Sequence, residues 1–351
     1  MKIDHVHFYT RNAARTRDWF INNIGFKAIG NCINQHTHTE LIALNSAFFL
    51  ISSPLTASSP VAKYLDRHPP GVADVAFRVK NLGTIIERSR LLGVNIRQQI
   101  KLWRSERNSF KFAQIAGWQD LQHTLIEDSG NRGCCVPFSL EPSKAEQTCS
   151  SHVTNIDHVV LNVAQGKLNS AVKLYQELFD FRIQQSFDIQ TSKSGLTSQA
   201  LIDDVETVQF NINEPTTTNS QIQEFIDFNG GSGIQHLALR SQNLIADVAW
   251  MQQGELNFLD VPDTYYQGLE ALPSLNSDER EAIAQHNILV DSNRASVDSL
   301  LMQIFSQPIF EQPTFFLEFI ERRLEARGFG QGNFKALFEA VERQSNINQN
   351  N

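Results

Sequence analysis

Hydrophobic and polar positions follow the same order in the two halves of the chain. The strand-like segment IDHVHFYT at 3–10 returns as IDHVVLNV at 156–163. Each copy precedes a stretch with apolar residues at three- and four-residue steps, 13–24 and 168–178, which predicts an amphipathic helix. Gly25 stands where the first of these helices is expected to stop.

Two further pairs of segments extend this repeat. GVADVAFRV at 71–79 resembles GIQHLALRS at 233–241, and HTLIED at 123–128 resembles FFLEFIE at 315–321. Each half therefore reads strand, helix, strands, and then the same again. The pattern predicts a duplicated α+β fold, with mixed sheets curving round a cavity and helices outside.

The chain of 351 residues suits two domains of about 150 residues each. We expect an N-terminal domain at 1–136, a linker at 137–152 and a C-terminal domain at 153–351. The linker is predicted from two prolines, several polar residues and no periodicity. A polar stretch at 214–223 is predicted as a loop.

Composition excludes several classes of protein. An apolar fraction of 41% and a charged fraction of 19% are typical of a globular chain rather than a disordered one. The net charge of −8 argues against a nucleic-acid surface and gives no support to membrane binding. The sequence has no run of eighteen apolar residues, no secretory leader at its start and no paired cysteine motif, so a reduced, cytoplasmic setting is expected.

Three ionisable residues are embedded in apolar, strand-like runs: His158, His236 and Glu318. A single histidine in a strand is more often an ordinary core or surface residue than a metal ligand. A carboxylate among apolar neighbours needs a partner, a metal or a proton. Two imidazoles and one carboxylate form the facial triad that leaves three positions open on non-haem iron(II), whereas a closed zinc site would want thiolates that these cysteines are not placed to supply.

Two other features lie near this set. Gln303 interrupts the apolar run 300–305, either as a buried polar group that needs partners or as an edge-strand residue facing water. The glycine-rich stretch 328–334 precedes the amphipathic segment 335–343. Because no βαβ pattern precedes the glycines, a hinged lid is favoured over a phosphate-binding loop.

The N-terminal half carries His5, Asp74 and Glu127 at places that we match to His158, His236 and Glu318. A second metal site is therefore conceivable. However, this half lacks a Phe-rich lining round Glu127 and any counterpart of the glycine-rich lid. We expect a structural role instead, with His5 and Glu127 as a hydrogen-bonded pair.

With these residues the chain resembles the 4-hydroxyphenylpyruvate dioxygenases of the vicinal-oxygen-chelate superfamily. The matching segments are IDHVVLNV, NINEP, SQIQ, GIQHLAL, TYYQ, LLMQIFSQP, PTFFLEFIERR and GFGQGNF, between about 156 and 342. The resemblance implies two tandem vicinal-oxygen-chelate (glyoxalase/bleomycin-resistance-like) domains, each of duplicated βαβββ modules, with a C-terminal helix. It also implies one Fe(II) per chain, in the second domain, on His158, His236 and Glu318.

The resemblance further implies a substrate pocket. Five polar positions and five further pocket positions, most of them rings, match: Ser198, Asn213, Gln221, Gln235, Gln303, Phe305, Phe316, Phe329, Asn333 and Phe334. Phe305 and Phe334 match the rings that sandwich the substrate. The assignment of Gln235 to the pocket conflicts with a regular strand, because Gln235 and its neighbour His236 would then point to opposite faces.

The implied reaction joins 4-hydroxyphenylpyruvate and O2 to give homogentisate and CO2, a step of tyrosine catabolism. The expected partners are this small molecule and O2, with no nucleic acid and no membrane, and a homo-oligomer is expected. No side chain beyond the metal ligands is assigned as an acid or base. Two alternatives stay open. The first is a hydroxymandelate synthase with the same metal site, although Pro215 and Phe334 resemble the dioxygenase pattern rather than that of the synthase. The second is a non-catalytic aromatic-binding protein of the same fold.

Overall fold

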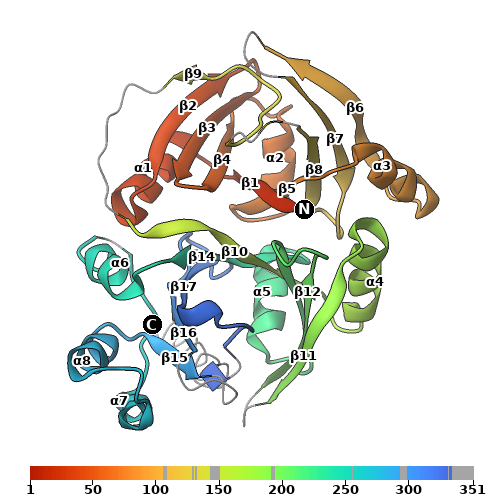
Figure 1. Ribbon diagram of the computed structural model, residues 1–351. Helices are drawn as coiled ribbons and strands as arrows, with labels where there is room; N and C mark the ends of the chain where they lie inside the picture. The colour runs from red at the N-terminus through yellow and green to blue at the C-terminus, as the bar shows by residue number, and fades with distance from the viewer. Residues whose placement is uncertain are drawn as a thin grey trace.

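The computed structural model describes residues 1–105, 109–128, 130, 133–142, 151–190, 194–254, 256–292, 299–330 and 332–333. These residues form two strongly curled sheets, one from each half of the chain (Figure 1). Strand β10 runs along the boundary between the two halves. Among the helices described, none is long and apolar enough to cross a membrane.

The N-terminal sheet has nine strands in the order β6-β7-β8-β5-β1-β4-β3-β2-β9. At its centre β1 pairs parallel with β4 and antiparallel with β5, so two βαβββ modules join side by side. The elements are β1 (Lys2–Tyr9), α1 (Ala13–Ile24), β2 (Lys27–Ile33), β3 (Thr37–Leu44), β4 (Ala47–Pro54), α2 (Pro60–Leu65), β5 (Gly71–Arg78), α3 (Leu82–Leu91), β6 (Ile96–Arg104), β7 (Ser109–Ala116), β8 (Gln122–Glu127) and β9 (Glu141–Pro142).

The C-terminal sheet has eight strands in the order β11-β12-β13-β10-β14-β17-β16-β15. Its centre repeats the same pairing, with β10 parallel to β13 and antiparallel to β14. The elements are β10 (Val153–Asn162), α4 (Leu168–Phe179), β11 (Arg182–Gln190), β12 (Gly195–Ile202), β13 (Gln209–Pro215), α5 (Gln221–Asn229), β14 (Gly233–Ser241), α6 (Leu244–Met251), α7 (Asp263–Tyr266), η1 (Gln267–Ala271), α8 (Ser277–Gln285), β15 (Leu289–Ser292), β16 (Leu300–Phe305), β17 (Phe316–Arg322) and η2 (Arg323–Glu325).

The α+β fold of two duplicated vicinal-oxygen-chelate domains is confirmed, and so are the two amphipathic helices. Helix α1 begins after Asn12, whose side chain accepts the Arg15 N–H, and ends at Gly25 with φ +88°. The predicted loop at 214–223 is too long, because α5 already begins at Gln221, where the Ser220 side chain caps it. The segment predicted as a linker contains β9, which pairs with β2, while residues 143–150 lie outside the described part. The domain boundaries remain a proposal.

One hydrophobic core runs through both halves. Val6 and Phe8 alternate with His5, His7 and Tyr9 along β1, so the apolar face of the strand is fully buried. Phe8 packs edge-to-face on Phe315 of the other half, with ring centroids 5.2 Å apart. The two sheets therefore share an apolar interface.

Candidate metal centre and cavity

Three adjacent strands at the centre of the C-terminal sheet bring the predicted triad together. His158 comes from β10, His236 from β14 and Glu318 from β17, and each side chain is at most 10% exposed. Oε2 of Glu318 lies 3.1 Å from Nε2 of His158 and 3.6 Å from Nε2 of His236. All three offer a ligand atom within 4.8 Å of the others, which is the convergence that a metal ion needs.

The pairing register explains why these residues meet. His158 lies opposite Ala238, and Ala238 lies opposite Glu318. The side chains of His158, Ala238 and Glu318 therefore project from one row across the sheet. The small side chain of Ala238 leaves the space between His158 and Glu318 open. His236 lies one step along the same face of β14, where its ring stacks on Phe316 at a centroid distance of 4.6 Å.

Asp157 and Arg322 orient His158 from behind. The Asp157 carboxylate accepts a hydrogen bond from His158 Nδ1 at 3.0 Å and a bidentate pair from Arg322 at 2.6 and 2.8 Å. Burial alone would raise the pKa of Asp157, but the Arg322 guanidinium outweighs it and holds this pKa below its usual value. Asp157 therefore stays ionised and fixes Nδ1 of His158 as a donor, which leaves Nε2 for a ligand.

Burial and neighbouring charges shift the pKa values of His158 and His236 in opposite directions. Burial lowers the pKa of His158, yet the charges and hydrogen bonds of Glu318 and Asp157 outweigh it and raise the pKa to about 9. Burial, with repulsion from His158, lowers the pKa of His236 well below its usual value. His236 is therefore neutral near pH 7, with Nδ1 donating to Oε1 of Gln235 at 3.3 Å.

A β-bulge resolves the conflict over Gln235. Val160 of β10 pairs with His236, but the next residue, Leu161, pairs with Ile234, so Gln235 is the extra residue on β14. Its side chain consequently lies at the same cavity as that of His236. The N-terminal sheet has the same irregularity, where His7 pairs with Asp74 and Phe8 pairs with Val72.

Gln303 joins the triad to the glycine-rich segment. Its Nε2 donates to Glu318 Oε1 at 2.8 Å and to the Phe329 carbonyl at 3.2 Å. Its Oε1 accepts from Asn333 Nδ2 at 3.0 Å, and Asn333 Oδ1 lies 2.7 Å from the Tyr265 hydroxyl. Because β16 lies between β15 and β17 and Gln303 is 1% exposed, the alternative of an edge residue facing water is wrong.

Most of the predicted pocket residues surround one cavity beside the triad. The lining includes eight of them: Ser198, Asn213, Gln221, Gln235, Gln303, Phe305, Phe316 and Phe329. Asn333 is buried behind Gln303, while Phe334 and the predicted lid helix at 335–343 lie outside the described residues. The sequence interpretation missed Asn211 and the apolar lining of Val160, Ile189, Leu196 and Ile222. Asn211 could have been found from the alternation in NINEP, because it stands two residues before Asn213 and so shares the same face of the strand.

The prediction that Glu127 occupies the place of Glu318 in the N-terminal half was wrong by three residues. Strands β5 and β8 pair Asp74 with Gln122, as β14 and β17 pair His236 with Phe316, so Thr124 takes the position of Glu318. Thr124 donates to Asp74 through its backbone N–H and its hydroxyl. Glu127 instead corresponds to Glu321. Each of these glutamates accepts the N–H of the first residue of a helix, Leu82 at 2.8 Å and Leu244 at 2.7 Å.

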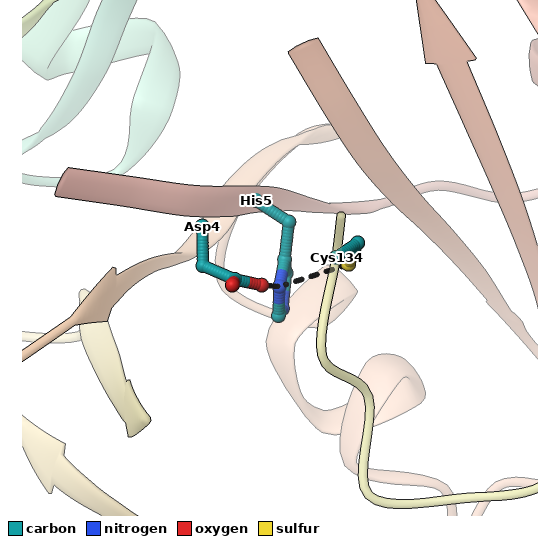
Figure 2. A group of neighbouring side chains, drawn as sticks. All are labelled: Asp4, His5 and Cys134. Atoms are coloured by element: carbon teal, nitrogen blue, oxygen red, sulfur yellow. Dashed lines mark hydrogen bonds and ion pairs between the residues drawn. The ribbon is translucent and has the colours of Figure 1, made fainter. Parts of the chain in front are cut away.

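His5 pairs with Asp4 rather than with Glu127. Figure 2 shows the His5 ring between Asp4 and Cys134. Nδ1 of His5 lies 2.8 Å from Asp4 Oδ1 and 3.4 Å from Cys134 Sγ. These three residues could geometrically hold a metal ion. However, the Asp4 carboxylate already accepts from Arg78 and from the Cys135 N–H, and burial raises the pKa of the Cys134 thiol well above its usual value. The cluster is explained as a buried hydrogen-bonded group.

Comparisons with known proteins agree with this geometry. A family model described as "Glyoxalase-like domain" matches residues 3–179, and one described as "Glyoxalase/Bleomycin resistance protein/Dioxygenase superfamily" matches residues 155–271. A 4-hydroxyphenylpyruvate dioxygenase from Yarrowia lipolytica is 33% identical over 97% of this chain and 91% of its own length. One from Dictyostelium discoideum is 32% identical over 99% of both chains.

The chain belongs to the 4-hydroxyphenylpyruvate dioxygenase family. An uncharacterized protein from Synechocystis is also similar, at 35% identity over 97% of both chains. Among solved structures, a triple mutant of 4-hydroxymandelate synthase from Streptomyces coelicolor matches with a TM-score of 0.87 and 25% identity over 98% of both chains. Membership of this family makes the chain an enzyme of the dioxygenase type, and the superfamily implies a metal cofactor, a small-molecule substrate and O2.

Proposed function

We propose that this chain is an iron(II)-dependent dioxygenase that converts 4-hydroxyphenylpyruvate and O2 to homogentisate and CO2. The observation that carries the proposal is the convergence of His158, His236 and Glu318 at the wall of a cavity lined by amides and phenylalanines. Two imidazole nitrogens and one carboxylate oxygen are the donor set that suits iron(II) with open coordination positions. A cytoplasmic location and a homo-oligomer remain predictions of the sequence.

The chemistry of the step would come from the bound iron, which supplies a Lewis acid for the α-keto acid group and a binding place for O2. The protein contributes positioning. Asp157 and Gln235 hold the two Nδ1 atoms as donors, so that both Nε2 atoms face Glu318. Phe316 and Phe305 form an apolar wall beside His236, which keeps water from that side and presents ring faces to an aromatic substrate.

The metal ligands are tested by single substitutions. Changing Glu318→Ala should abolish turnover and reduce bound iron from one equivalent to close to zero, because one charged donor is lost and both imidazoles lose their partner. His5→Ala, at the position in β1 that corresponds to His158, is the matched control and should retain one equivalent. Metal analysis and circular dichroism of both variants provide the readout. An iron content that persists in Glu318→Ala, or disappears in His5→Ala, would contradict the assignment.

Hydroxymandelate synthase activity is the second candidate, because a member of that class has the same fold at a TM-score of 0.87. Both reactions begin from the same keto acid, so consumption of oxygen does not separate them. The two products have the same mass, so liquid chromatography with fragmentation in the mass spectrometer separates them: homogentisate carries its new hydroxyl on the ring and hydroxymandelate on the side chain. Finding hydroxymandelate as the main product would replace the first proposal with the second.

A further inference from the structure

Asn211 is a buried polar residue of the cavity wall to which the family resemblance gave no role. It lies on β13, 6% exposed, between Phe210 and Ile212, which both belong to the hydrophobic core. Since side chains alternate along a strand, Asn211 points away from the core and into the cavity that holds the triad. It shares this face of β13 with Asn213.

The side-chain oxygen of Asn211 has no hydrogen-bond partner among the residues that the structure describes. The neighbouring cavity amides differ in this respect. Gln303 is bonded to Glu318 and Asn333, Gln235 to His236, and Asn213 to Asn162. Gln221 has an unpartnered Nε2, but it lies on α5 and also lines a second, neighbouring cavity. A buried acceptor without a donor is costly unless a ligand completes it.

The register places Asn211 at a defined distance from the metal centre. Val160 pairs with Asn211 on one side and with His236 on the other, so the three lie in one row across β13, β10 and β14. Two strand spacings of about 4.8 Å give a span of about 10 Å between the backbones of Asn211 and His236. The apolar side chain of Val160 lies between them and also lines the cavity. This row offers a metal at one end, an apolar surface in the middle and a polar group at the other end.

We propose that Asn211 binds the hydroxyl group of the aromatic ring, and that it thereby selects hydroxylated aryl pyruvates over unsubstituted ones. The inference rests on the proposed function, which places the keto acid end at the metal. The ring would then lie over Val160 with its para position near Asn211. A phenolic hydroxyl can both donate and accept, so it completes the Asn211 amide in either orientation of that amide. An unsubstituted ring would leave the Asn211 oxygen without a partner.

The test compares the binding of two keto acids, 4-hydroxyphenylpyruvate and phenylpyruvate, to iron(II)-loaded protein without oxygen. Dissociation constants from calorimetry report recognition separately from turnover. We expect the wild type to prefer 4-hydroxyphenylpyruvate, and Asn211→Leu to reduce that preference roughly tenfold, the contribution of about one hydrogen bond. Phenylpyruvate should bind the variant about as well as the wild type. Asn211→Ala removes the same atoms without adding volume and serves if the leucine variant does not fold.

Gln199→Leu is the matched control. Gln199 lies on the neighbouring strand β12 between Ser198 and Ala200, so its side chain points to the opposite face, and its Oε1 also lacks a partner among the described residues. Its removal should leave the preference unchanged. A preference retained in Asn211→Leu and Asn211→Ala, or equal losses for both keto acids, would overturn the role of Asn211 and leave the proposed function standing. A wild type that binds neither keto acid would overturn the proposed function itself.

Discussion

At the scale of single residues, Arg322 does two things at once. Its guanidinium forms the bidentate pair with Asp157, and it also donates to the carbonyls of Ala326 and Gly328 at 3.1 and 2.7 Å. The first contact orients His158, and the second ties down the turn that brings Phe329 to the cavity. The Phe329 ring then packs edge-on against His158 at 5.3 Å. One buried cation therefore supports both the metal centre and the cavity wall.

Changing Arg322→Leu should lower the free energy of unfolding by about 3–5 kcal/mol, because Asp157 remains as a buried carboxylate without its cation. Iron affinity should fall roughly 10- to 100-fold, as is typical when a residue that orients a ligand is lost. Chemical denaturation and metal titration measure the two effects.

Arg323→Leu is the control for this change. Arg323 also forms two ion pairs, with Glu279 and Glu321, but its side chain is 28% exposed, so its loss should cost no more than about 1 kcal/mol. If both variants lose the same stability and iron affinity, Arg322 has no special part in the site.

At the scale of elements, the segment after β17 folds back over the triad and depends on one glycine. Gly330 has φ +73°, a left-handed conformation that side chains disfavour. A Cβ atom at this position would lie 1.7 Å from Oε1 of Gln303. The backbone can therefore approach Gln303 only because residue 330 has no side chain, and the bond from Gln303 to the Phe329 carbonyl requires that approach.

Changing Gly330→Ala should displace Gln303 from Glu318 and strain the turn. Left-handed strain alone costs roughly 1–2 kcal/mol, and a displaced group beside the metal should lower kcat/KM by roughly 10- to 100-fold. Steady-state kinetics and thermal melting provide the measurements. In Gly268→Ala the new methyl group would meet nothing within 4 Å, so that variant should behave like the wild type. Normal kinetics in Gly330→Ala would show that Gln303 can move without consequence.

At the scale of the whole molecule, a buried hydrogen bond between His123 and Tyr175 connects the two halves within their apolar interface. His123 of β8 is fully buried, and its Nδ1 lies 2.9 Å from the Val75 carbonyl, to which it must donate. Its Nε2 is then an acceptor, and the Tyr175 hydroxyl of the other half donates to it at 3.0 Å. This pairing works only for neutral His123, and burial lowers the pKa of His123 accordingly.

Acid should therefore destabilise the molecule through His123 and His7, whose pKa values burial lowers in the folded state. Burial also lowers the pKa of His7, to about 4. In the unfolded chain both histidines take up protons near pH 6.5, so the unfolded state binds more protons and stability falls as the pH drops below that value. For His7 the loss extends down to about pH 4. Each histidine contributes at most about 1.4 kcal/mol per pH unit.

The measurement is the free energy of unfolding between pH 7.5 and pH 4.5, for the wild type and for His123→Gln. The variant should be less stable at pH 7.5 but should show a flatter dependence on pH, because one protonation site of the unfolded state is gone. Parallel curves for the two proteins would mean that His123 is not held neutral by the fold.

Much of the fold and of the candidate centre could be predicted from the sequence, because each inference used a property of one segment. Alternation along single strands and three- and four-residue steps along single helices are local, so the repeat and the helical stretches at 13–24 and 168–178 could be predicted. Glu318 stood out because a carboxylate within an apolar run needs a partner wherever the strand lies.

Only the tertiary structure decided features that belong to pairs of strands. The bulge that turns Gln235 towards the cavity exists in the pairing of β14 with β10, and no single strand reveals it. In the same way, the register of β5 against β8 assigned Thr124, rather than Glu127, to the place of Glu318. The missing partner of Asn211 is known only once its neighbours are placed around it. A residue type determines which interactions a side chain needs, and the packing of distant segments determines which of them it obtains.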